Sequence, residues 1–277
     1  PDAAGDGRPF FGRDAMANYL IMGSRQLGHD VFDIEGGACS LDLDRTTMKK
    51  LWDNYYVPMV QGWFSAEGKF RSDAVKTGDL ICYVGSSSSV VYFPQTVTVD
   101  DATSYPIQLG ALPNPSFEHG KPCSPQQGAG FVVTKSDEKK ETACVEFLKW
   151  FTAKEQNTDF SVSAGYVPVT KDALTLENLQ AAAESIDGAS GYLVNLPATL
   201  DTIEAGVYAN PPFKGGVEAR AVLDRALSDR AVADRAAVVE AMAAGASSEE
   251  AVAPYLDDAG FDAWLADLET QLREAIA

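Results

Sequence analysis

The sequence predicts an α/β protein in which short strands are mixed with amphipathic helices. Three observations indicate this class. Apolar residues recur at helical spacing in several segments, and short apolar runs between turn residues are typical of strands. In addition, 45% of the 277 residues are hydrophobic, as in packed globular proteins. The length suits one large domain or two modest ones.

Two helices are predicted in the first sixty residues, because apolar side chains recur there on one face. Gly28 offers a stop for the first helix, and we expect Pro58 and Gly62 to break the second. Residues 30–44, between them, are rich in glycine and acidic residues and are expected to form a loop. The two apolar faces consist of Met16, Tyr19, Leu20, Gly23 and Leu27, and of Met48, Leu51, Trp52 and Tyr55.

Strands dominate the prediction for the middle of the chain. Residues 80–84 are expected to form a buried strand that runs into a glycine and four serines, 85–89. A helix-like apolar run follows and ends at Pro94. Residues 105–112 and 131–133 have the composition of further strands, the latter after a glycine-rich stretch at 127–130.

Helices return in the second half of the chain. One is predicted to begin at Ser136 and Asp137, and residues 165–169 form an extended piece after it, because Pro168 keeps its neighbour out of the helical region. Another follows the Gly215-Gly216 pair. Ser247 and Glu250 have the spacing of a capping box. The apolar faces consist of Cys144, Phe147, Leu148 and Phe151; of Val222, Leu223, Ala226 and Leu227; and of Phe261, Leu265, Leu268, Leu272 and Ile276.

The charge balance excludes some partners. The chain has 40 acidic and 22 basic residues, a formal net charge of −18. Nucleic acids and anionic lipid surfaces require Lys and Arg clusters, so neither is expected to bind. No run of about 18 apolar residues occurs, so no membrane span is predicted.

The four cysteines predict neither a zinc ribbon nor a thioredoxin-like centre, because no two of them form a CxxC pair. Up to two disulfides could form in an oxidising compartment, and their pairing stays open. Cys82 and Cys144 fall on apolar segments and are interpreted as small buried hydrophobes. The four are Cys39, Cys82, Cys123 and Cys144.

Catalytic and metal signals are weak. The two histidines, His29 and His119, fall in predicted loops, and no GxSxG elbow is present. The spacing of the acidic residues between positions 30 and 44 does not match a calcium-binding loop. They are better interpreted as a solvated loop. We therefore predict no enzyme activity, no metal site and no cofactor. These acids are Asp30, Asp33, Glu35, Asp42 and Asp44.

Two segments have both a binding and a structural interpretation. Residues 85–89 place backbone N–H groups and hydroxyls at a helix start, which suits an anion or a hydroxyl-rich ligand. They could equally be ordinary N-cap serines. Tyr166, between a glycine and a proline-containing stretch, could stack on a sugar ring or belong to the core.

The order of several segments resembles one known family. Segments 76–86, 127–136, the following helix at 143–152 and 165–169 together are similar to the family 1 extracellular solute-binding proteins of ABC importers. This family includes relatives of maltose- and glycerol-3-phosphate-binding proteins. The best-matched stretch is 48–174, and residues 245–251 resemble a late helix start of the family.

The resemblance implies a type II periplasmic-binding-protein-like fold, mainly the second, C-terminal lobe. Residues 1–116 would be an α/β portion of that lobe, 117–165 a hinge-crossing segment that normally contributes to the first lobe, and 166–277 the helical portion. Family members have an opening section that builds most of the first lobe. Nothing before Pro1 corresponds to it, so we expect a fragment.

The resemblance also implies a function. Two lobes close around a small polar solute, a sugar or a glycerol phosphate, and deliver it to the transmembrane subunits of an ABC permease. The protein would be a monomer at the extracellular face of a bacterial envelope, in the periplasm or lipid-anchored. The alternative is a non-catalytic interaction or scaffold module. The implied solute-binding residues are Asn18, Tyr19, Gly85, Ser86, Ser87, Gly128, Gly130 and Tyr166.

Overall fold

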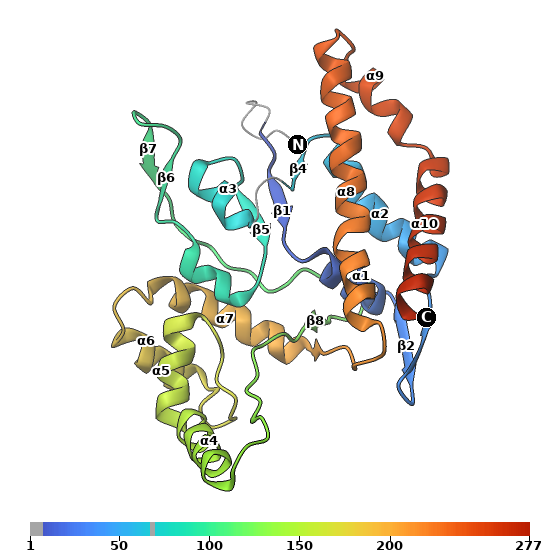
Figure 1. Ribbon diagram of the computed structural model, residues 1–277. Helices are drawn as coiled ribbons and strands as arrows, with labels where there is room; N and C mark the ends of the chain where they lie inside the picture. The colour runs from blue at the N-terminus through green and yellow to red at the C-terminus, as the bar shows by residue number, and fades with distance from the viewer. Residues whose placement is uncertain (1–7, 67–69) are drawn as a thin grey trace.

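The computed structural model describes residues 8–66 and 70–277, which form a helix-rich α/β arrangement (Figure 1). A three-stranded parallel sheet has the order β4-β1-β5. Three further strand pairs flank it. The sheet strands are β1 (Phe11–Arg13), β4 (Phe64–Ser65) and β5 (Cys82–Val84); the pairs are β2 (Phe32–Glu35) with β3 (Ala38–Leu41), β6 (Thr96–Thr98) with β7 (Ser104–Pro106), and β8 (Ser124–Pro125) with β9 (Val207–Tyr208).

The larger core lies among four helices that pack beside the sheet. The long helix α8 contacts α1, α2 and α10, and its Leu223 and Leu227 are almost fully buried. Trp52 stacks on Tyr56 at 3.8 Å between ring centroids and lies 5.0 Å from Trp264. These helices are α1 (Met16–Gln26), α2 (Arg45–Val60), α8 (Gly216–Ala243) and α10 (Asp258–Ile276), with α9 (Ser248–Val252) and the 3-10 turn η2 (Ala253–Tyr255) between the last two.

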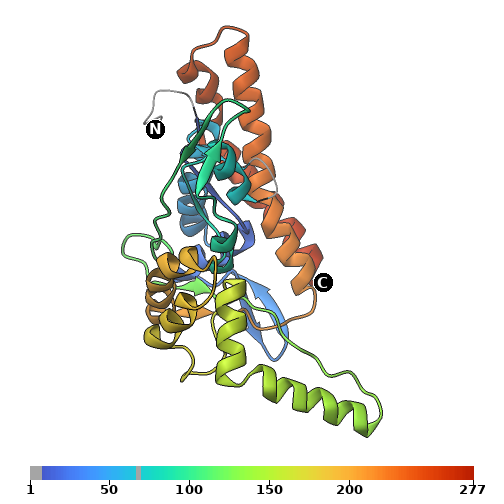
Figure 2. The same cartoon turned by 90° about the vertical axis from the view of Figure 1, so that its left-hand side faces the viewer.

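A smaller core joins a second group of helices. Val162, Leu179, Tyr192 and Leu196 are buried there. Helix α7 packs along the 3-10 turn η1, which follows β5, so this group lies directly beside the end of the sheet (Figure 2). Its elements are η1 (Ser87–Tyr92), α5 (Lys154–Ala164), α6 (Leu176–Glu184) and α7 (Ser190–Ala205), while α3 (Arg71–Thr77) packs against β5 and β6.

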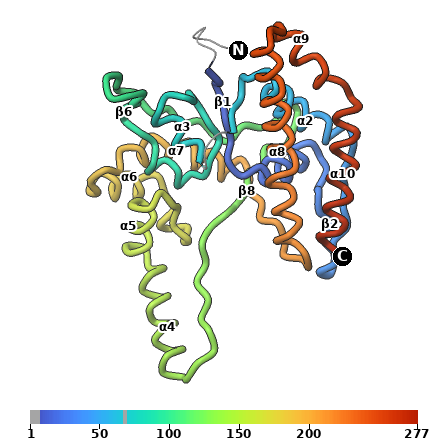
Figure 3. Tube along the Cα trace, turned by 45° about the horizontal axis from the view of Figure 1, so that its top comes forward, coloured from blue at the N-terminus to red at the C-terminus, as the bar shows by residue number. Residues whose placement is uncertain are grey.

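Helix α4 (Glu138–Phe151) has an exposed apolar face. It projects from the rest of the molecule at the end of a long extended stretch (Figure 3). None of its residues is buried, and Phe147 and Trp150 are 48% and 55% exposed. The helix prediction is confirmed, but the interpretation of Cys144 as buried is wrong. Cys144 is exposed, and the ring contacts of this face, with Phe131 and with Phe160 of α5, leave it uncovered.

Most predicted helices are confirmed, including the apolar faces of α1, α2, α8 and α10. The capping box is also confirmed, since the Ser247 hydroxyl accepts from the Glu250 N–H and the Glu250 carboxylate accepts from the Ser247 N–H. Pro58, however, does not break α2, which continues to Val60. Pro58 has no N–H to donate to the preceding turn, and the helix ends two residues after it.

Three strand and loop predictions are corrected. Residues 30–44 contain the β2–β3 hairpin, whose Gly36 and Gly37 both have positive φ, as a type I′ turn requires. Residues 131–133 form no strand, because no strand in the described chain lies beside them. Of the predicted 105–112 strand only the start is in β7, and in the 80–84 segment only 82–84 form a strand, half-buried, with Ile81 62% exposed.

The division into segments 1–116, 117–165 and 166–277 stays a prediction. No helix in the described residues combines the length and the apolar character that crossing a bilayer would need.

Candidate functional site

The carboxyl ends of β1 and β5 lie side by side and define the candidate site. The two strands are parallel, with Arg13 opposite Val84, and the Asp14 N–H donates to the Val84 carbonyl over 2.9 Å. Helix α1 and η1 therefore both begin at this edge. Ligands of α/β proteins bind at the carboxyl ends of the strands, so polar groups at this edge are candidates for ligand binding.

The serines after β5 form a polar loop on this edge. The Ser86 Oγ accepts from the Ser88 N–H at 3.3 Å and caps η1, and the Ser89 Oγ donates to the Ser86 carbonyl at 2.7 Å. The N-cap interpretation of these serines is thus confirmed. Gly85, Ser86 and Ser87 remain exposed, and their role in solute binding stays a prediction.

Asn18, on the first turn of α1, ties three segments together. Its Nδ2 donates to the Gln127 Oε1 at 2.9 Å, and its Oδ1 accepts from the Arg220 Nη2 at 2.6 Å. This arrangement holds residue 127 and α8 against the start of α1. Gly128 and Gly130 follow as exposed backbone with open space where a Cβ would lie, so their approach to a solute stays a prediction.

Tyr19 lies in the core and not on a cleft. It is 5% exposed, its hydroxyl donates to the Leu51 carbonyl at 2.7 Å, and the Arg13 guanidinium lies 4.3 Å from the ring centroid. Burial raises the pKa of Tyr19 to about 12. The expectation that it faces a solute is corrected, because both its ring and its hydroxyl already have protein partners.

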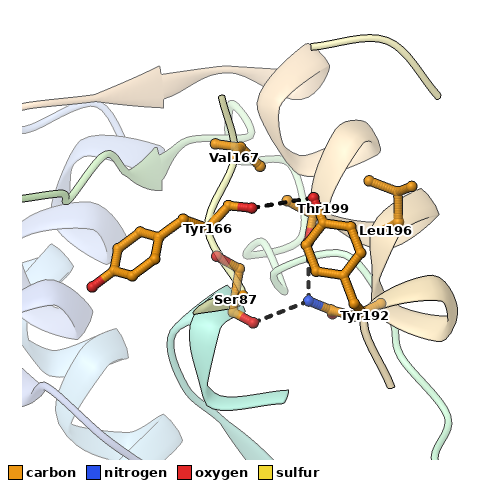
Figure 4. A pocket seen from close by; sticks show the side chains of 8 residues that line it. Ser87, Tyr166, Val167, Tyr192, Leu196 and Thr199 are labelled. Atoms are coloured by element: carbon orange, nitrogen blue, oxygen red, sulfur yellow. Dashed lines mark hydrogen bonds between the residues drawn. The ribbon is translucent and has the colours of Figure 1, made fainter. Parts of the chain in front are cut away.

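Tyr166 and Ser87 meet beside α7. The Tyr192 hydroxyl donates to the Tyr166 carbonyl at 3.1 Å, and the Asn195 Nδ2 donates to the Ser87 carbonyl at 3.2 Å (Figure 4). The small niche between them leaves no room for a water molecule. The Tyr166 ring points away from the niche, is 40% exposed and stacks on Phe160 at 6.0 Å.

A larger cavity of about 500 Å³ lies at the other end of the η1–α7 contact. Its walls come from η1, the stretch after β7, the end of α5 and the start of α7. Its volume is in the range of ligand pockets, but its wall is a mixture of apolar and polar groups in which Asp187 is the acidic side chain. It adjoins the niche through Tyr192, which lines both.

Sequence reasoning missed the residues that hold this site together. Tyr192, Asn195 and Thr199 occur at helical spacing on one face of α7. That spacing is visible in the sequence and could have predicted a polar helix face. Gln127 and Arg220 gave no such signal, because their contacts join segments far apart in the chain.

Three of the acidic residues at 30–44 have local partners. Asp30 pairs with Arg25 at 2.5 Å, and Asp44 caps α2 by accepting from the Thr47 N–H. Asp42 accepts from His29 Nδ1 at 2.9 Å and raises the pKa of that histidine. Within the described residues, no cluster of three or more His, Cys, Asp or Glu is placed to hold a metal ion, and all four cysteines are free thiols.

Comparisons with known proteins give two findings. The family model of bacterial extracellular solute-binding proteins matches residues 6–186. Among solved structures, the cyclic alpha-maltosyl-1,6-maltose binding protein from Arthrobacter globiformis is similar, with 17% sequence identity and a TM-score of 0.57. The similarity covers 98% of this chain and 60% of that one, and it shows the periplasmic-binding-protein-like α/β fold. A search of curated protein sequences finds no match.

Proposed function

Because the chain belongs to the bacterial extracellular solute-binding protein family, we propose that it captures a small polar solute and releases it chemically unchanged. The supporting observation is the polar edge at the ends of β1 and β5. Exposed backbone and hydroxyl groups of the serine loop follow β5, and the Tyr166 segment approaches this loop at Ser88. The Asn18–Gln127 pair lies at the start of the helix that follows β1. Such groups recognise hydroxyl-rich ligands.

The solute is a carbohydrate or a glycerol phosphate. Serine hydroxyls donate to and accept from polyol groups, and the half-exposed ring of Tyr166 offers a face for stacking. The related solved structure is described as a maltosyl-maltose binding protein, which favours a sugar. That structure has a longer chain. In a whole protein of this kind, we expect a second lobe to form the opposite wall of the cleft.

Delivery and location follow from the same proposal. The protein passes its solute to the transmembrane subunits of an ABC permease, works as a monomer and resides outside the bacterial cytoplasm, in the periplasm or anchored at the surface. Catalysis forms no part of the proposal, which rests on membership of a solute-binding family.

Calorimetric titration of the full-length protein with a panel of sugars and glycerol phosphates tests the proposal. Tyr166→Ala and Ser86→Ala should each weaken binding by about 1–3 kcal/mol for each buried interaction with the solute that the substitution removes. Tyr105→Ala is the control for the first variant, because Tyr105 is equally exposed on β7. Ser247→Ala is the control for the second, because it removes another N-cap hydroxyl. No binding of either solute class would reject the proposal.

The exposed aromatic face of α4 keeps one alternative open. A non-catalytic interaction or scaffold module would use such a face for a protein partner. In that case the Tyr166 and Ser86 variants would bind the partner as well as the parent protein does, and no solute would compete.

A further inference from the structure

We propose that the captured solute has an oxyanion group, a phosphate or a carboxylate, and that Arg220 binds it. This inference rests on the proposed function and decides between its two solute classes. It starts from the guanidinium group that donates to Asn18 at the polar edge.

Arg220 lies on the second turn of α8 and is half-buried. A guanidinium has five N–H donors, and one bond, from Nη2 to the Asn18 Oδ1 at 2.6 Å, is the hydrogen bond that Arg220 makes within the described part of the chain. No carboxylate there forms an ion pair with it. Its remaining donors therefore stay available to a ligand.

Two acidic residues on the packed elements, Asp224 and Asp14, already have backbone partners. Asp224, one turn further along α8, accepts from the Ala17 N–H at 2.8 Å and so occupies the start of α1. Asp14, at the end of β1, accepts from the Arg71 N–H at 3.2 Å. The N-terminus of α1 is consequently occupied by a protein carboxylate, whereas Arg220 uses one of its five N–H donors, on Asn18.

Several other arginines of this acidic chain have a carboxylate partner. Arg25, Arg45 and Arg273 each form an ion pair at 2.5–2.8 Å. Arg235, further along α8, is also half-buried without an ion pair in the described chain, but its Nη1 donates to the Val60 carbonyl at 3.0 Å. Arg13, at the end of β1, also makes no ion pair in the described chain, but the rings of Phe11 and Tyr19 lie against it. It contributes positive charge to the same edge.

The chemistry of a guanidinium favours an oxyanion. Its planar fork binds two oxygens of a phosphate or carboxylate at once, and Asn18 fixes the plane by accepting one N–H. A neutral sugar would leave the cation partly desolvated on closure without a compensating charge. The exposed serines would then hold the hydroxyl groups of the same molecule.

Calorimetry of the full-length protein with glycerol phosphate, glucuronate and glucose tests this inference. We expect glycerol phosphate or glucuronate to bind at least about tenfold more tightly than glucose, since hydrogen bonds between charged groups are about twice as strong as neutral ones. The difference between the first two probes shows which oxyanion is recognised. Arg220→Gln should abolish this preference, and Arg220→Lys should retain part of it.

Arg225→Gln is the matched control, because it removes the same charge from an exposed position on the same helix. Thermal unfolding of each variant establishes that the fold is intact. If Arg220→Gln is unstable, the preference for the oxyanion probes over glucose is measured on Arg220→Lys instead. Tight glucose binding that Arg220→Gln leaves unchanged overturns this inference but not the proposed function. Binding of none of the probes overturns both.

Discussion

At the scale of single residues, Gly165 allows two polar segments to touch. Its φ is +75°, and a Cβ there would lie 2.8 Å from the Ser88 Cα and 3.0 Å from the Ser88 carbonyl oxygen. The close approach brings Tyr166 beside the serine loop. Backbone atoms cannot move aside as a flexible side chain can, so this contact requires glycine.

Gly165→Ala should therefore destabilise the protein more than Gly188→Ala does. Gly188 has a similar φ of +84° with open space around it, so its variant carries only the left-handed strain of about 1–2 kcal/mol. The clash at Gly165 adds to that strain and separates Tyr166 from Ser87. Urea unfolding and solute titration of both variants measure the two effects, and equal destabilisation would contradict the assigned close approach.

Buried tyrosines predict the response to alkaline pH. Burial raises the pKa of Tyr19, Tyr55 and Tyr192 to about 12, from 10.0 in the unfolded chain. Between these values the unfolded chain releases protons that the folded protein retains. The free energy of unfolding should therefore fall as pH rises above 10.

The urea midpoint at increasing pH checks this expectation. Tyr192→Phe should reduce the pH dependence, and it should also cost about 1 kcal/mol at neutral pH, because it removes the hydrogen bond to the Tyr166 carbonyl. Tyr105→Phe, at an exposed position, should leave the profile unchanged. A midpoint independent of pH in this range would show that these hydroxyls are not buried.

At the scale of elements, two phenylalanines on the apolar faces of helices differ in how far they are buried. Phe261 on α10 is fully buried, whereas Phe147 on α4 is 48% exposed. Phe261→Ala should cost about 3–5 kcal/mol, as truncation of a core aromatic does. Phe147→Ala should cost less than about 1 kcal/mol. Urea unfolding of both variants measures the difference, and a large destabilisation at Phe147 would mean that α4 packs against a partner element.

The same contrast explains what the sequence could predict. Helices α1, α2, α8 and α10 each have an apolar face, and that face is buried in the structure. The α4 stripe is as regular, but periodicity reports a preference for burial and not the presence of a partner. The Gly36-Gly37 pair is typical of a hairpin turn, but the acidic residues around it favoured the prediction of a loop.

The candidate site likewise contains residues that the sequence could predict and residues that it could not. Asn18 became a candidate only through the family resemblance. Ser87 and Tyr166 are recognisable from local sequence, since serines after a strand and a tyrosine beside glycine have characteristic patterns. Their meeting depends on Tyr192 and Asn195, which belong to a helix far along the chain. Arg220 joins Asn18 across 202 positions, so only the three-dimensional packing of α1 against α8 reveals it.

At the scale of the whole molecule, the described chain has two hydrophobic cores of unequal size. The larger contains 26 buried residues, mostly from α1, α2, α8 and α10. The smaller contains six, from α5, α6, α7 and the N-cap of α7. The serine loop belongs to the sheet beside the larger core, and Tyr166 belongs to the smaller core. The candidate site thus lies where the two cores meet.

Unequal cores predict unequal local stability. A small core buries less apolar surface, so α6 and α7 should open with a lower free energy than α1 and α2. Native-state hydrogen exchange should show the amides of α6 and α7 exchanging first, with the opening free energy of α1 and α2 close to the global free energy of unfolding.

A saturating solute should slow exchange in α7 and η1 most, because it stabilises only states in which the serine loop and Tyr166 are together. Uniform exchange across both cores would instead indicate a single cooperative unit, and protection confined to α10 would place the solute elsewhere.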